Sequence, residues 1–432
     1  MQMNILVAGT GYVGTTTALV LADMGWNVTG LDPDAEKIRT LLQGSIPFYE
    51  EGLEELLRKH LQQASIQFTT DASEAIRQSD AIFICVGTPP LPDGSVDMRY
   101  IRQISEEIGR HADGYRLVIV KSTVPVGTHA KVAEWIRSAQ PSPHPFDVAS
   151  NPEFLREGSA LADSFHPDRV VIGADGEEAV QALRKLYASL NCPFVVTTPR
   201  TAEMIKYASN AFLATKISYI NELARLCDSL DIDVNEIARG IGLDPRIGAL
   251  FLRAGIGYGG SCFPKDIAGL LQTARENGAR LGLLEEAAEI NRTQYLHLLN
   301  KARARLGSFR GKTVAVLGIA FKPDTDDIRE APSLRLIRSL LSENADVRVH
   351  DPIAKLPPDL ALEPLTSCGT PEEAAQGADA VFLCTEWKAY RRLDWPGIKS
   401  AMKQANLFDG RNMMNADHMK AIGFYYQGIG YR

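Results

Sequence analysis

The feature that most constrains the fold lies in the first 32 residues, where a short apolar strand runs into a glycine turn. Residues 4–8 are followed by a helix at about 15–24 and a strand at 27–31 that ends at Asp32, and the turn between them is Gly9-Thr10-Gly11-Tyr12-Val13-Gly14. Glycines at this spacing admit a pyrophosphate, which the helix N-terminus holds, and the acid accepts ribose hydroxyls. The stretch predicts a Rossmann domain that binds a dinucleotide.

An acidic side chain at Asp32 disfavours a 2′-phosphate on the ribose, so NAD is expected rather than NADP. Lys37 is placed near the adenosine ribose, with a solvated lysine on a helix face as the alternative. A plain strand–helix–strand unit whose glycines hold no ligand is the competing interpretation of the whole stretch. The predicted cofactor contacts of this region are Gly9, Gly11, Tyr12, Val13, Gly14, Asp32 and Lys37.

Further strands and helices complete a predicted first domain at residues 1–198. The strands fall at residues 81–86, 117–120, 146–150, 169–173 and 193–196, with helices at 53–63, 98–112 and 176–190. In open parallel sheets, ligands bind beyond the carboxyl ends of the strands. Thr88 and Thr123 follow two of these strands, so both are placed to meet the cofactor.

The rest of the chain is predicted to form a helical domain and a second α/β domain. Residues 199–308 have a helical apolar period, and residues 309–432 repeat the first plan with strands at 311–318, 346–350 and 379–384. The second turn, at 318–323, lacks G-x-G-x-x-G, which indicates a different ligand. Cys85 and Cys384 fall inside matching strands, which favours packing in the core. The fold class is α/β: an N-terminal Rossmann domain, a helical middle domain and a C-terminal Rossmann-like domain.

Charge and cysteine usage argue against several classes of protein. The 432 residues carry a net charge of −7, which offers no positive surface to nucleic acid or an anionic membrane. No apolar run reaches the roughly 18–20 residues of a membrane span. Six scattered cysteines, with no signal peptide before residue 4, indicate a reducing cytoplasm. Eight histidines show no ligand spacing, so we expect no metal site.

A second glycine-rich stretch, at residues 257–266, carries the candidate nucleophile. It reads Gly-Tyr-Gly-Gly-Ser-Cys-Phe-Pro-Lys-Asp, and Pro264 suits the first turn of a helix. Cys262 then stands at a helix N-terminus beside Lys265, and both effects favour the thiolate. Asp266 follows four residues later, on the same helix face. A glycine-rich loop with a structural cysteine is the alternative, because free cysteines usually pack as small hydrophobes.

Two further pairs share this four-residue spacing. Glu153 and Glu157 flank the loop after a strand, and Lys206 and Asn210 lie on the predicted helix after residue 200. Taken alone, the two glutamates are explained by a capping arrangement. Lys206 is explained by a solvated helix face, and Asn210 by a polar position on a helix. Together with Cys262 they supply a nucleophile, an ammonium, an amide donor and carboxylates beside an NAD site. That set suits carbonyl chemistry through a covalent thiohemiacetal.

Seven ordered motifs across the chain resemble the UDP-glucose 6-dehydrogenase family of nucleotide-sugar dehydrogenases. They are GTGYVG at 9–14, KSTVPVGT at 121–128, NPEFLREG at 151–158, the Lys206/Asn210 helix, GYGGSCFPKD at 257–266, residues 318–329 and Asp409-Gly410-Arg411. The resemblance implies oxidation of a sugar C6 alcohol to a carboxylate, with two NAD⁺ per turnover and UDP-glucose as the substrate. GDP-mannose, UDP-N-acetylglucosamine and UDP-N-acetylmannosamine remain alternative substrates.

The resemblance also implies roles for individual residues. Cys262 captures the aldehyde, Lys206 and Asn210 donate to the oxyanion, and Asp266 and a water held by Thr123 and Glu153 act as bases, with the individual proton transfers left open. Further cofactor contacts are Thr88, Thr123, Glu157, Lys265 and Arg329. The substrate contacts are Glu153, Phe154, Leu155, Arg156, Glu157, Lys206, Asn210, Arg246, Phe251, Arg253, Tyr258, Gly259, Cys262, Phe263, Lys322 and Arg411.

Arg246 comes from a neighbouring subunit in some family members, which implies a homodimer or a higher even oligomer with its dimerisation surface in residues 199–308. Glu51 stands where the family usually has proline, and Arg253 where lysine or asparagine is usual. Two rival functions stay open. A two-electron hydroxyacid dehydrogenase needs neither the cysteine nor a second α/β domain, and a non-catalytic nucleotide-sugar binding protein does not need the cysteine, lysine, asparagine and aspartate.

Overall fold

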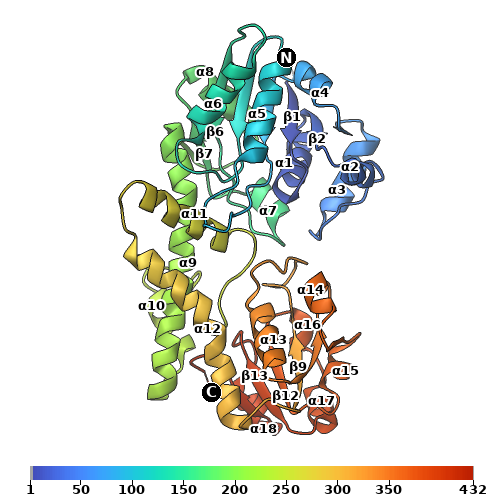
Figure 1. The fold of residues 1–432 in the computed structure, drawn as a ribbon, viewed down its shortest axis with the longest axis vertical. Helices are drawn as coiled ribbons and strands as arrows, with labels where there is room; N and C mark the ends of the chain where they lie inside the picture. Colours follow the sequence, from blue (N-terminus) through green and yellow to red (C-terminus); the bar gives the residue numbers. More distant parts are fainter. Residues whose placement is uncertain (1–2, 432) are drawn as a thin grey trace. The chain divides into compact units, whose positions relative to one another are not determined.

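The computed structural model describes residues 3–431, and Met1, Gln2 and Arg432 lie outside the described residues, as do the outer ends of the predicted first and third domains. The chain divides into two compact units (Figure 1). Unit 1 contains the residues up to Ser209 together with Ala268–Ala279. Unit 2 contains Asn210–Ile267 and the residues from Arg280 onward. The domain boundaries expected after residues 198 and 308 stay predictions.

Unit 1 is built on one eight-stranded sheet. Neighbouring strands are parallel except β6 and β7, which meet antiparallel at Ser150 and Gly173. The strands in spatial order are β3 (Ile66–Thr69), β2 (Asn27–Leu31), β1 (Asn4–Ala8), β4 (Ala81–Ile84), β5 (Arg116–Val120), β6 (Phe146–Ser150), β7 (Val170–Gly173) and β8 (Phe194–Thr197).

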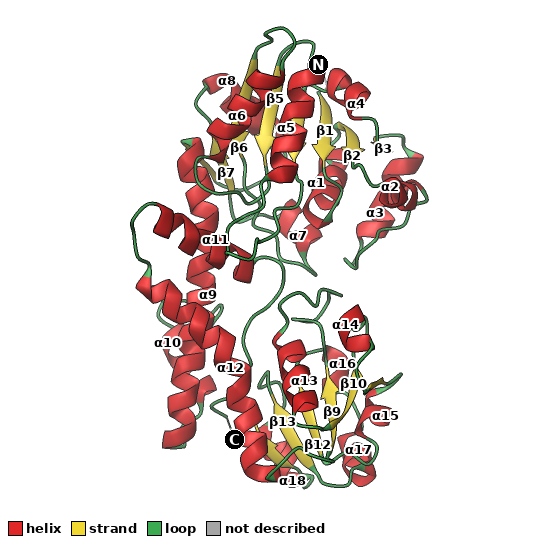
Figure 2. Cartoon of the chain, in the orientation of Figure 1, coloured by secondary structure: helices red, strands yellow, loops and turns green. Residues whose placement is uncertain are grey.

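Helices cover both faces of this sheet (Figure 2). They are α1 (Tyr12–Asp23), α2 (Ala35–Leu42), α3 (Leu53–Gln62), α4 (Ala72–Gln78), α5 (Arg99–His111), α6 (Thr128–Ala139), α7 (Ala160–Phe165) and α8 (Glu177–Leu186). Strand side chains alternate between the faces. Ile5 and Val7 pack in a core with residues of α1, α3 and α8, while Leu6 and Ala8 pack in another with residues of α4, α5 and α6. The near-continuous apolar strands follow from burial on both faces.

The middle of the chain is helical. It contains α9 (Pro199–Leu230), α10 (Val234–Gly242), α11 (Phe263–Glu276) and α12 (Gly282–Leu306). Residues of α9 and α11 belong to both units, since unit 1 ends at Ser209 within α9 and takes up α11 again at Ala268. The predicted helical middle region is confirmed, and so is the start of α11 close to Pro264.

Unit 2 repeats the strand order of unit 1. Its strands in spatial order are β11 (Leu365–Ser367), β10 (Asp346–His350), β9 (Thr313–Leu317), β12 (Ala380–Leu383), β13 (Asn406–Asp409) and β14 (Tyr425–Gln427), all parallel. Its remaining helices are α13 (Pro332–Ser342), α14 (Pro358–Ala361), α15 (Pro371–Ala375), α16 (Lys388–Arg391), α17 (Trp395–Ala401) and α18 (Ala416–Ala421). The first six strands of each sheet follow one order, so the predicted α/β repeat and the fold class are confirmed.

Two local expectations are wrong, and one four-residue spacing does not lie on a helix. Cys85 and Cys384 come directly after β4 and β12 instead of inside them, yet both are buried, and burial raises the pKa of each thiol to about 12. The helix expected from residue 15 begins at Tyr12, because Gly11 serves as its N-cap. The segment with Glu153 and Glu157 is a loop, so these two residues do not share a helix face. In residues 3–431 no helix is long and apolar enough to cross a membrane.

A buried ion cluster in unit 2 joins two helices to the C-terminal segment. The Asp228 carboxylate on α9 pairs with His297 Nε2 at 2.6 Å and Lys301 Nζ at 2.5 Å on α12, and accepts the Gly430 N–H at 3.1 Å. Lys301 also donates to the Gly428 carbonyl at 2.6 Å. Burial acts to raise the pKa of Asp228, but these donors outweigh burial and hold the pKa below its ordinary value.

We expect Asp228→Asn to lower the free energy of unfolding of unit 2 by about 3 kcal/mol at pH 7, because Lys301 keeps its charge without its buried counter-ion. The stabilisation by a carboxylate with a lowered pKa is present above the unfolded value of about 3.9 and is lost as pH falls through the folded value. The deficit should therefore shrink below about pH 4. Urea unfolding at several pH values measures it, with exposed Glu286→Gln on α12 as the control. An equal deficit at all pH values would contradict the assignment.

Candidate active site

The turn after β1 leaves room for a phosphate at one glycine and closes tightly at two others. A Cβ on Gly9, whose φ is +94°, would lie 2.8 Å from the Cys85 carbonyl oxygen, and one on Gly14 would lie 1.8 Å from the Gly9 oxygen. A Cβ on Gly11 would meet nothing within 4 Å. The backbone at Gly11 and the N-terminus of α1 are therefore open to a pyrophosphate, and the turn fits the expected dinucleotide.

Asp32 lies at the end of β2, and both of its carboxylate oxygens accept hydrogen bonds. Its Oδ2 accepts the Thr10 N–H at 2.9 Å and the Lys37 ammonium at 2.9 Å, and its Oδ1 accepts the Asp34 N–H at 3.1 Å. Burial acts to raise the pKa of Asp32, but these donors hold it below its ordinary value. The carboxylate is thus kept charged, as an acceptor for ribose hydroxyls requires, and Lys37 lies beside it.

A buried glutamate that the sequence analysis did not single out connects Tyr12 to the loop after β6. Tyr12 donates its hydroxyl to Glu50, and the same carboxylate accepts the N–H groups of Gly158 and Ala160 at 2.7 Å each. Burial and the nearby Glu50 raise the pKa of Tyr12 far above its ordinary value. Glu50 therefore holds the loop of residues 151–158 against the first turn of α1, where Tyr12 and Val13 lie.

The two predicted threonines meet at adjacent strand ends. The Thr88 hydroxyl donates to the Thr123 carbonyl at 3.0 Å, and the Ser122 hydroxyl donates to the Val86 carbonyl at 2.7 Å. These bonds fix the loop of residues 121–128 against the segment after β4. Because β4 and β5 are parallel neighbours, both loops lie at the carboxyl edge of the sheet, as expected.

Glu153 and Lys206 form a buried ion pair in unit 1. Lys206 Nζ donates to Glu153 Oε1 at 2.8 Å, with side chains 3% and 6% exposed, and Glu153 Oε2 accepts the Leu155 N–H at 2.6 Å. Burial acts to raise the pKa of Glu153, but the Lys206 ammonium and the bonds hold it below its ordinary value. Lys206 also lies 5.4 Å from the centre of the Phe154 ring. The structure thus brings two predicted catalytic residues into direct contact.

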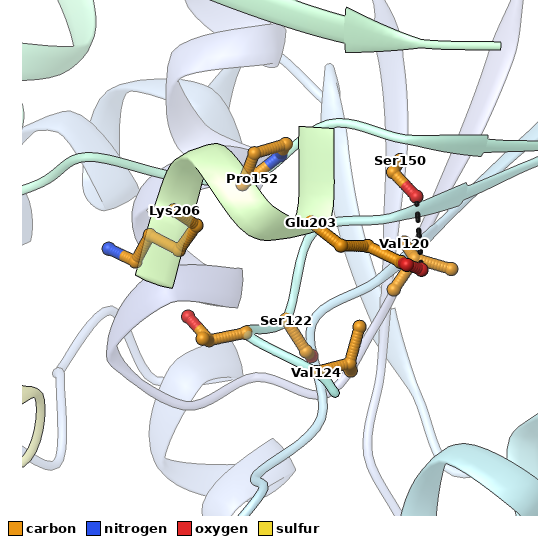
Figure 3. A pocket seen from close by; sticks show the side chains of 8 residues that line it. Val120, Ser122, Val124, Ser150, Pro152, Glu203 and Lys206 are labelled. Atoms are coloured by element: carbon orange, nitrogen blue, oxygen red, sulfur yellow. Dashed lines mark hydrogen bonds between the residues drawn. The ribbon is translucent and has the colours of Figure 1, made fainter. Parts of the chain in front are cut away.

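The neighbouring predicted contacts occupy the same loop. Arg156 is paired with Asp163, with its Nε 3.0 Å from Oδ2, and Glu157 lies near enough to Tyr12 to contribute to its raised pKa, after burial and Glu50. A water-sized cavity of about 10 Å³ lies beside this loop (Figure 3). Its lining includes Thr123, Pro152, Glu203 and Lys206.

In unit 2, Cys262 directly precedes α11, and its carbonyl accepts the Asp266 N–H at 2.9 Å. The Ser261 hydroxyl oxygen lies 3.5 Å from the sulfur. Asp266 is buried, and its two oxygens accept from Asn210 Nδ2 and Lys265 Nζ, each at 2.6 Å. The partly exposed thiol therefore stands at a helix N-terminus one turn from a carboxylate held by two donors.

The glycine-rich segment before Cys262 packs against the C-terminal sheet region. A Cβ on Gly259 would lie 2.6 Å from the Glu330 carbonyl oxygen, and one on Gly260 would lie 2.7 Å from the Phe321 ring. Asn291 exchanges two hydrogen bonds with the Tyr258 backbone, at 2.7 and 3.0 Å. The backbone at Gly259 and Gly260 is thus held at contact distance, which leaves no room for a side chain at these two positions.

The predicted basic residues have different environments. Arg411 donates from its three guanidinium nitrogens to the carbonyls of Cys384 (2.7 Å), Gly257 (2.9 Å) and Phe321 (2.9 Å). Arg253 donates to the Asn412 carbonyl at 3.4 Å, and Lys322 lies 5.4 Å from the Phe321 ring centre. Arg246 and Arg329 are exposed and pair with Asp244 and Asp327. Phe251 and Tyr258 both lie against the Phe263 ring, at 6.2 and 5.7 Å.

Sequence reasoning missed two buried acids, Glu50 and Glu203. Glu203 lies one helical turn before Lys206, and this spacing on the predicted helix could have indicated it. Glu50 lies in an irregular segment, where no helical or strand periodicity points to a buried position. Within residues 3–431, no group of three or more His, Cys, Asp or Glu side chains is placed to hold a metal ion.

Comparisons with known proteins agree with this arrangement. Three models of the UDP-glucose/GDP-mannose dehydrogenase family match the chain: the NAD binding domain at residues 3–191, the central domain at 200–293 and the UDP binding domain at 315–416. The chain is 43% identical over 428 residues to UDP-glucose 6-dehydrogenase TuaD of Bacillus subtilis strain 168, covering 99% of this chain and 93% of the relative.

Solved structures are similar over the whole length. A UDP-glucose dehydrogenase from the archaeon Pyrobaculum islandicum superposes with a TM-score of 0.93 at 38% identity, covering 100% of this chain and 98% of the other. A UDP-D-ManNAc dehydrogenase from Pyrococcus horikoshii gives 0.89 at 29% identity, with 99% of both chains covered. Matches that span both sheets and the helical region show that the chain belongs to the UDP-glucose/GDP-mannose dehydrogenase family.

Proposed function

We propose that this NAD-dependent oxidoreductase converts UDP-glucose to UDP-glucuronate in a four-electron oxidation, with Cys262 as the nucleophile. The observation that carries the proposal is the partly exposed Cys262 thiol at the N-terminus of α11, one turn before the buried Asp266. Full-length relatives named as UDP-glucose dehydrogenases, at 43% and 38% identity, support UDP-glucose over the UDP-D-ManNAc of a 29% identical relative.

The turn after β1 and Asp32 are the groups that would hold NAD⁺, with the pyrophosphate at Gly11 and the ribose at Asp32. Thr88, Thr123, Glu157, Lys265 and Arg329 are the further proposed contacts. When bound, NAD⁺ accepts a hydride in each of the two oxidations, so one sugar consumes two NAD⁺. The tight contacts at Gly9 and Gly14 support this fit, because they keep α1 close to β1 while Gly11 stays open.

The covalent steps fall to Cys262. Its thiolate adds to the C6 aldehyde carbon left by the first oxidation, forming a thiohemiacetal. The second oxidation of C6 leaves a thioester on the same sulfur. Water then adds to the thioester carbon, the C–S bond breaks, and the carboxylate leaves with the thiolate restored. The Ser261 hydroxyl at 3.5 Å and the helix N-terminus both support a negatively charged sulfur.

Buried polar groups are proposed to stabilise the oxyanion and to transfer the protons. Lys206 and Asn210, four residues apart on α9, are the proposed donors to the negative oxygen at each tetrahedral stage. Asp266, and a water held by Thr123 and Glu153, are the proposed bases. Burial acts to raise the pKa of Glu153, but the Lys206 charge and the hydrogen bonds together lower it, which supports a carboxylate that is ionised when it orients such a water.

The nucleotide half of the substrate is assigned to unit 2. The backbone of residues 251–261, with Arg253, Lys322 and Arg411, is the proposed contact surface for the sugar and diphosphate. The match of residues 315–416 to a UDP binding domain supports this assignment. Glu153–Glu157, Lys206 and Asn210, together with Phe251, Tyr258, Gly259 and Phe263, complete the proposed sugar contacts.

The substrate and the number of electrons can be tested in one assay. We expect two NADH per UDP-glucose consumed, with UDP-glucuronate as the product, and at least about tenfold lower kcat/KM for GDP-mannose, UDP-N-acetylglucosamine and UDP-N-acetylmannosamine, because added or inverted sugar groups must fit the same contacts. Absorbance at 340 nm and mass spectrometry measure both quantities. One NADH per sugar would indicate a two-electron enzyme, and binding without NADH a non-catalytic protein.

We expect Cys262→Ser to lower steady-state formation of UDP-glucuronate at least about 100-fold, because a hydroxyl is a far weaker nucleophile than a thiolate at neutral pH. Affinity for NAD⁺ should change less than about twofold. The measurement is product formation by mass spectrometry, with NAD⁺ affinity from calorimetry. Cys192→Ser, at a partly exposed cysteine before β8, is the matched control. A Cys262→Ser enzyme with near wild-type turnover would refute the covalent route.

We also propose a homodimer or higher even oligomer, formed through an apolar stripe on α9. The side chains of Phe212, Tyr219, Leu226 and Leu230 are between 50% and 66% exposed and recur at helical spacing along one face. Such a contiguous apolar surface is typical of a protein interface. Arg246 lies among exposed Leu243, Ile247 and Leu250, which supports its reaching a neighbouring subunit.

We expect Leu226→Arg to convert the oligomer to a monomer at micromolar concentration, because an arginine in the centre of this stripe would be buried without a partner. Light scattering coupled to size-exclusion chromatography gives the mass. Leu362→Arg, at a residue 90% exposed after α14, should leave the mass unchanged. A wild-type monomer under the same conditions would contradict the proposal. The six cysteines are scattered along the sequence without the spacing of a disulfide framework, which supports a reducing cytoplasm as the proposed location.

A further inference from the structure

Glu203 is a buried carboxylate on α9 that the proposed reaction does not use. It is 4% exposed, and its oxygens face three donors from two other segments. Oε2 accepts the Gly127 N–H at 2.5 Å, and Oε1 accepts the His129 N–H at 2.9 Å. Oε1 also accepts the Ser150 hydroxyl at 3.5 Å, the bond drawn in Figure 3. The His129 ring nitrogen lies 3.6 Å from Oε1.

Two of these donors belong to the N-terminus of α6, which has no cap of its own. Its N-cap residue is Gly127, with φ at +95° and no side chain to accept a hydrogen bond. The first N–H groups of any helix need outside acceptors, and a carboxylate there also meets the positive end of the helix dipole. Glu203 supplies that acceptor from 76 residues further along the chain.

The cap completes the anchoring of the loop at residues 121–128. At its start, the Ser122 hydroxyl binds the Val86 carbonyl and the Thr88 hydroxyl binds the Thr123 carbonyl. At its end, Glu203 holds the Gly127 N–H. Thr123, the proposed cofactor and water contact, is therefore fixed between two anchors, and only the second one comes from α9.

The same helix carries Lys206 one turn further on. Figure 3 shows the Glu203 and Lys206 side chains leaving α9 in different directions, with Glu203 toward Ser150. Both line the water-sized cavity of about 10 Å³ together with Ser122 and Thr123. A cavity of this size holds a single water at most. A shift of α6 relative to α9 would therefore change the distance from Thr123 to the Lys206–Glu153 pair.

We propose that Glu203 is a positioning residue that sets the place of the Thr123 loop relative to Lys206 and Glu153. The inference rests on the proposed function through the roles given there to these three residues. Burial raises the pKa of Glu203 above its ordinary value, against the lowering effect of the Gly127 and His129 N–H groups. An amide in its place can accept one of these N–H groups, but its NH₂ group would face the other donor.

The first test measures the loop directly, without any substrate. We expect peptides covering residues 121–130 to exchange backbone hydrogen at least about tenfold faster in Glu203→Gln than in the wild type, by mass spectrometry, because the cap is lost. Glu134→Gln, at an exposed position on α6, is the matched control and should exchange as the wild type does. Unchanged exchange of this loop in Glu203→Gln would overturn the proposal.

The second test asks whether the anchor matters for the reaction. We expect Glu203→Gln to lower kcat with UDP-glucose about 10- to 100-fold, as small misplacements of reacting groups do, with KM for UDP-glucose within about twofold. Glu203→Asp keeps the carboxylate and should recover part of the loss. If Glu203 had a purely structural role, Glu203→Gln would reduce the amount of folded enzyme, and the folded enzyme would not combine a lowered kcat with an unchanged KM. Unchanged kcat, or Glu203→Asp no better than Glu203→Gln, would overturn the role in the reaction.

The two measurements separate this inference from the proposed function. Should the wild type form no NADH from any nucleotide sugar, the proposed function fails, and hydrogen exchange still decides whether Glu203 anchors the loop. Should Glu203→Gln fail to fold, Glu203→Asp carries both measurements, with faster exchange and a kcat below that of the wild type expected. Wild-type values for both quantities in Glu203→Asp would then overturn the proposal.

Discussion

The ion pair between Lys206 and Glu153 is the interaction on which unit 1 of this protein depends. Both side chains are almost fully buried, and a buried charge is costly unless it is paired and hydrogen-bonded. Glu153 meets that condition by accepting from Lys206 and from the Leu155 N–H. The pair thereby fixes α9 to the loop of residues 151–158. Glu203, on the same helix, fixes α9 to a second loop, so one helix sets the positions of both.

The two sheets share one structural contact, made by the acidic residue after the second strand. Comparing the two copies distinguishes what holds the fold from what a ligand would meet. In unit 1, Asp32 accepts the Thr10 N–H of the first turn, and in unit 2 Asp351 accepts the Ile319 and Ala320 N–H groups at 2.8 and 3.1 Å. The acid after the second strand thus holds the turn after the first in both copies. In unit 2 the same carboxylate oxygen also accepts from the Trp387 indole, whereas in unit 1 it also accepts from the Lys37 ammonium. A partly exposed ammonium beside the acid is the local difference that a charged ligand would meet.

Sequence reasoning located the elements whose signals are local. Strands β1, β2, β4 to β10 and β12 follow from apolar runs between turn residues, and the start of α11 follows from Pro264. Short edge strands such as β11, and helices α2 and α4 that begin at the capping residues Asp34 and Asp71, were missed because they are too short to show a period. The anchors at Glu50 and Glu203 were missed for another reason. Their backbone partners lie 74 to 110 residues away, and no spacing in the chain records them.

Arg411, a predicted substrate contact, makes backbone contacts that its motif does not reveal. Its guanidinium nitrogens each donate to a backbone carbonyl, from the end of β12, the glycine segment and Phe321. The Asp409 carboxylate holds the turn that contains Arg411, through the N–H groups of Arg411, Met413 and Met414. The side chain thus ties three backbone segments together, and Glu386 at 3.4 Å offsets part of its charge. What Arg411 offers an anion is therefore mainly a fixed positive field beneath the glycine segment, and removing it would disturb the segment as well as the charge.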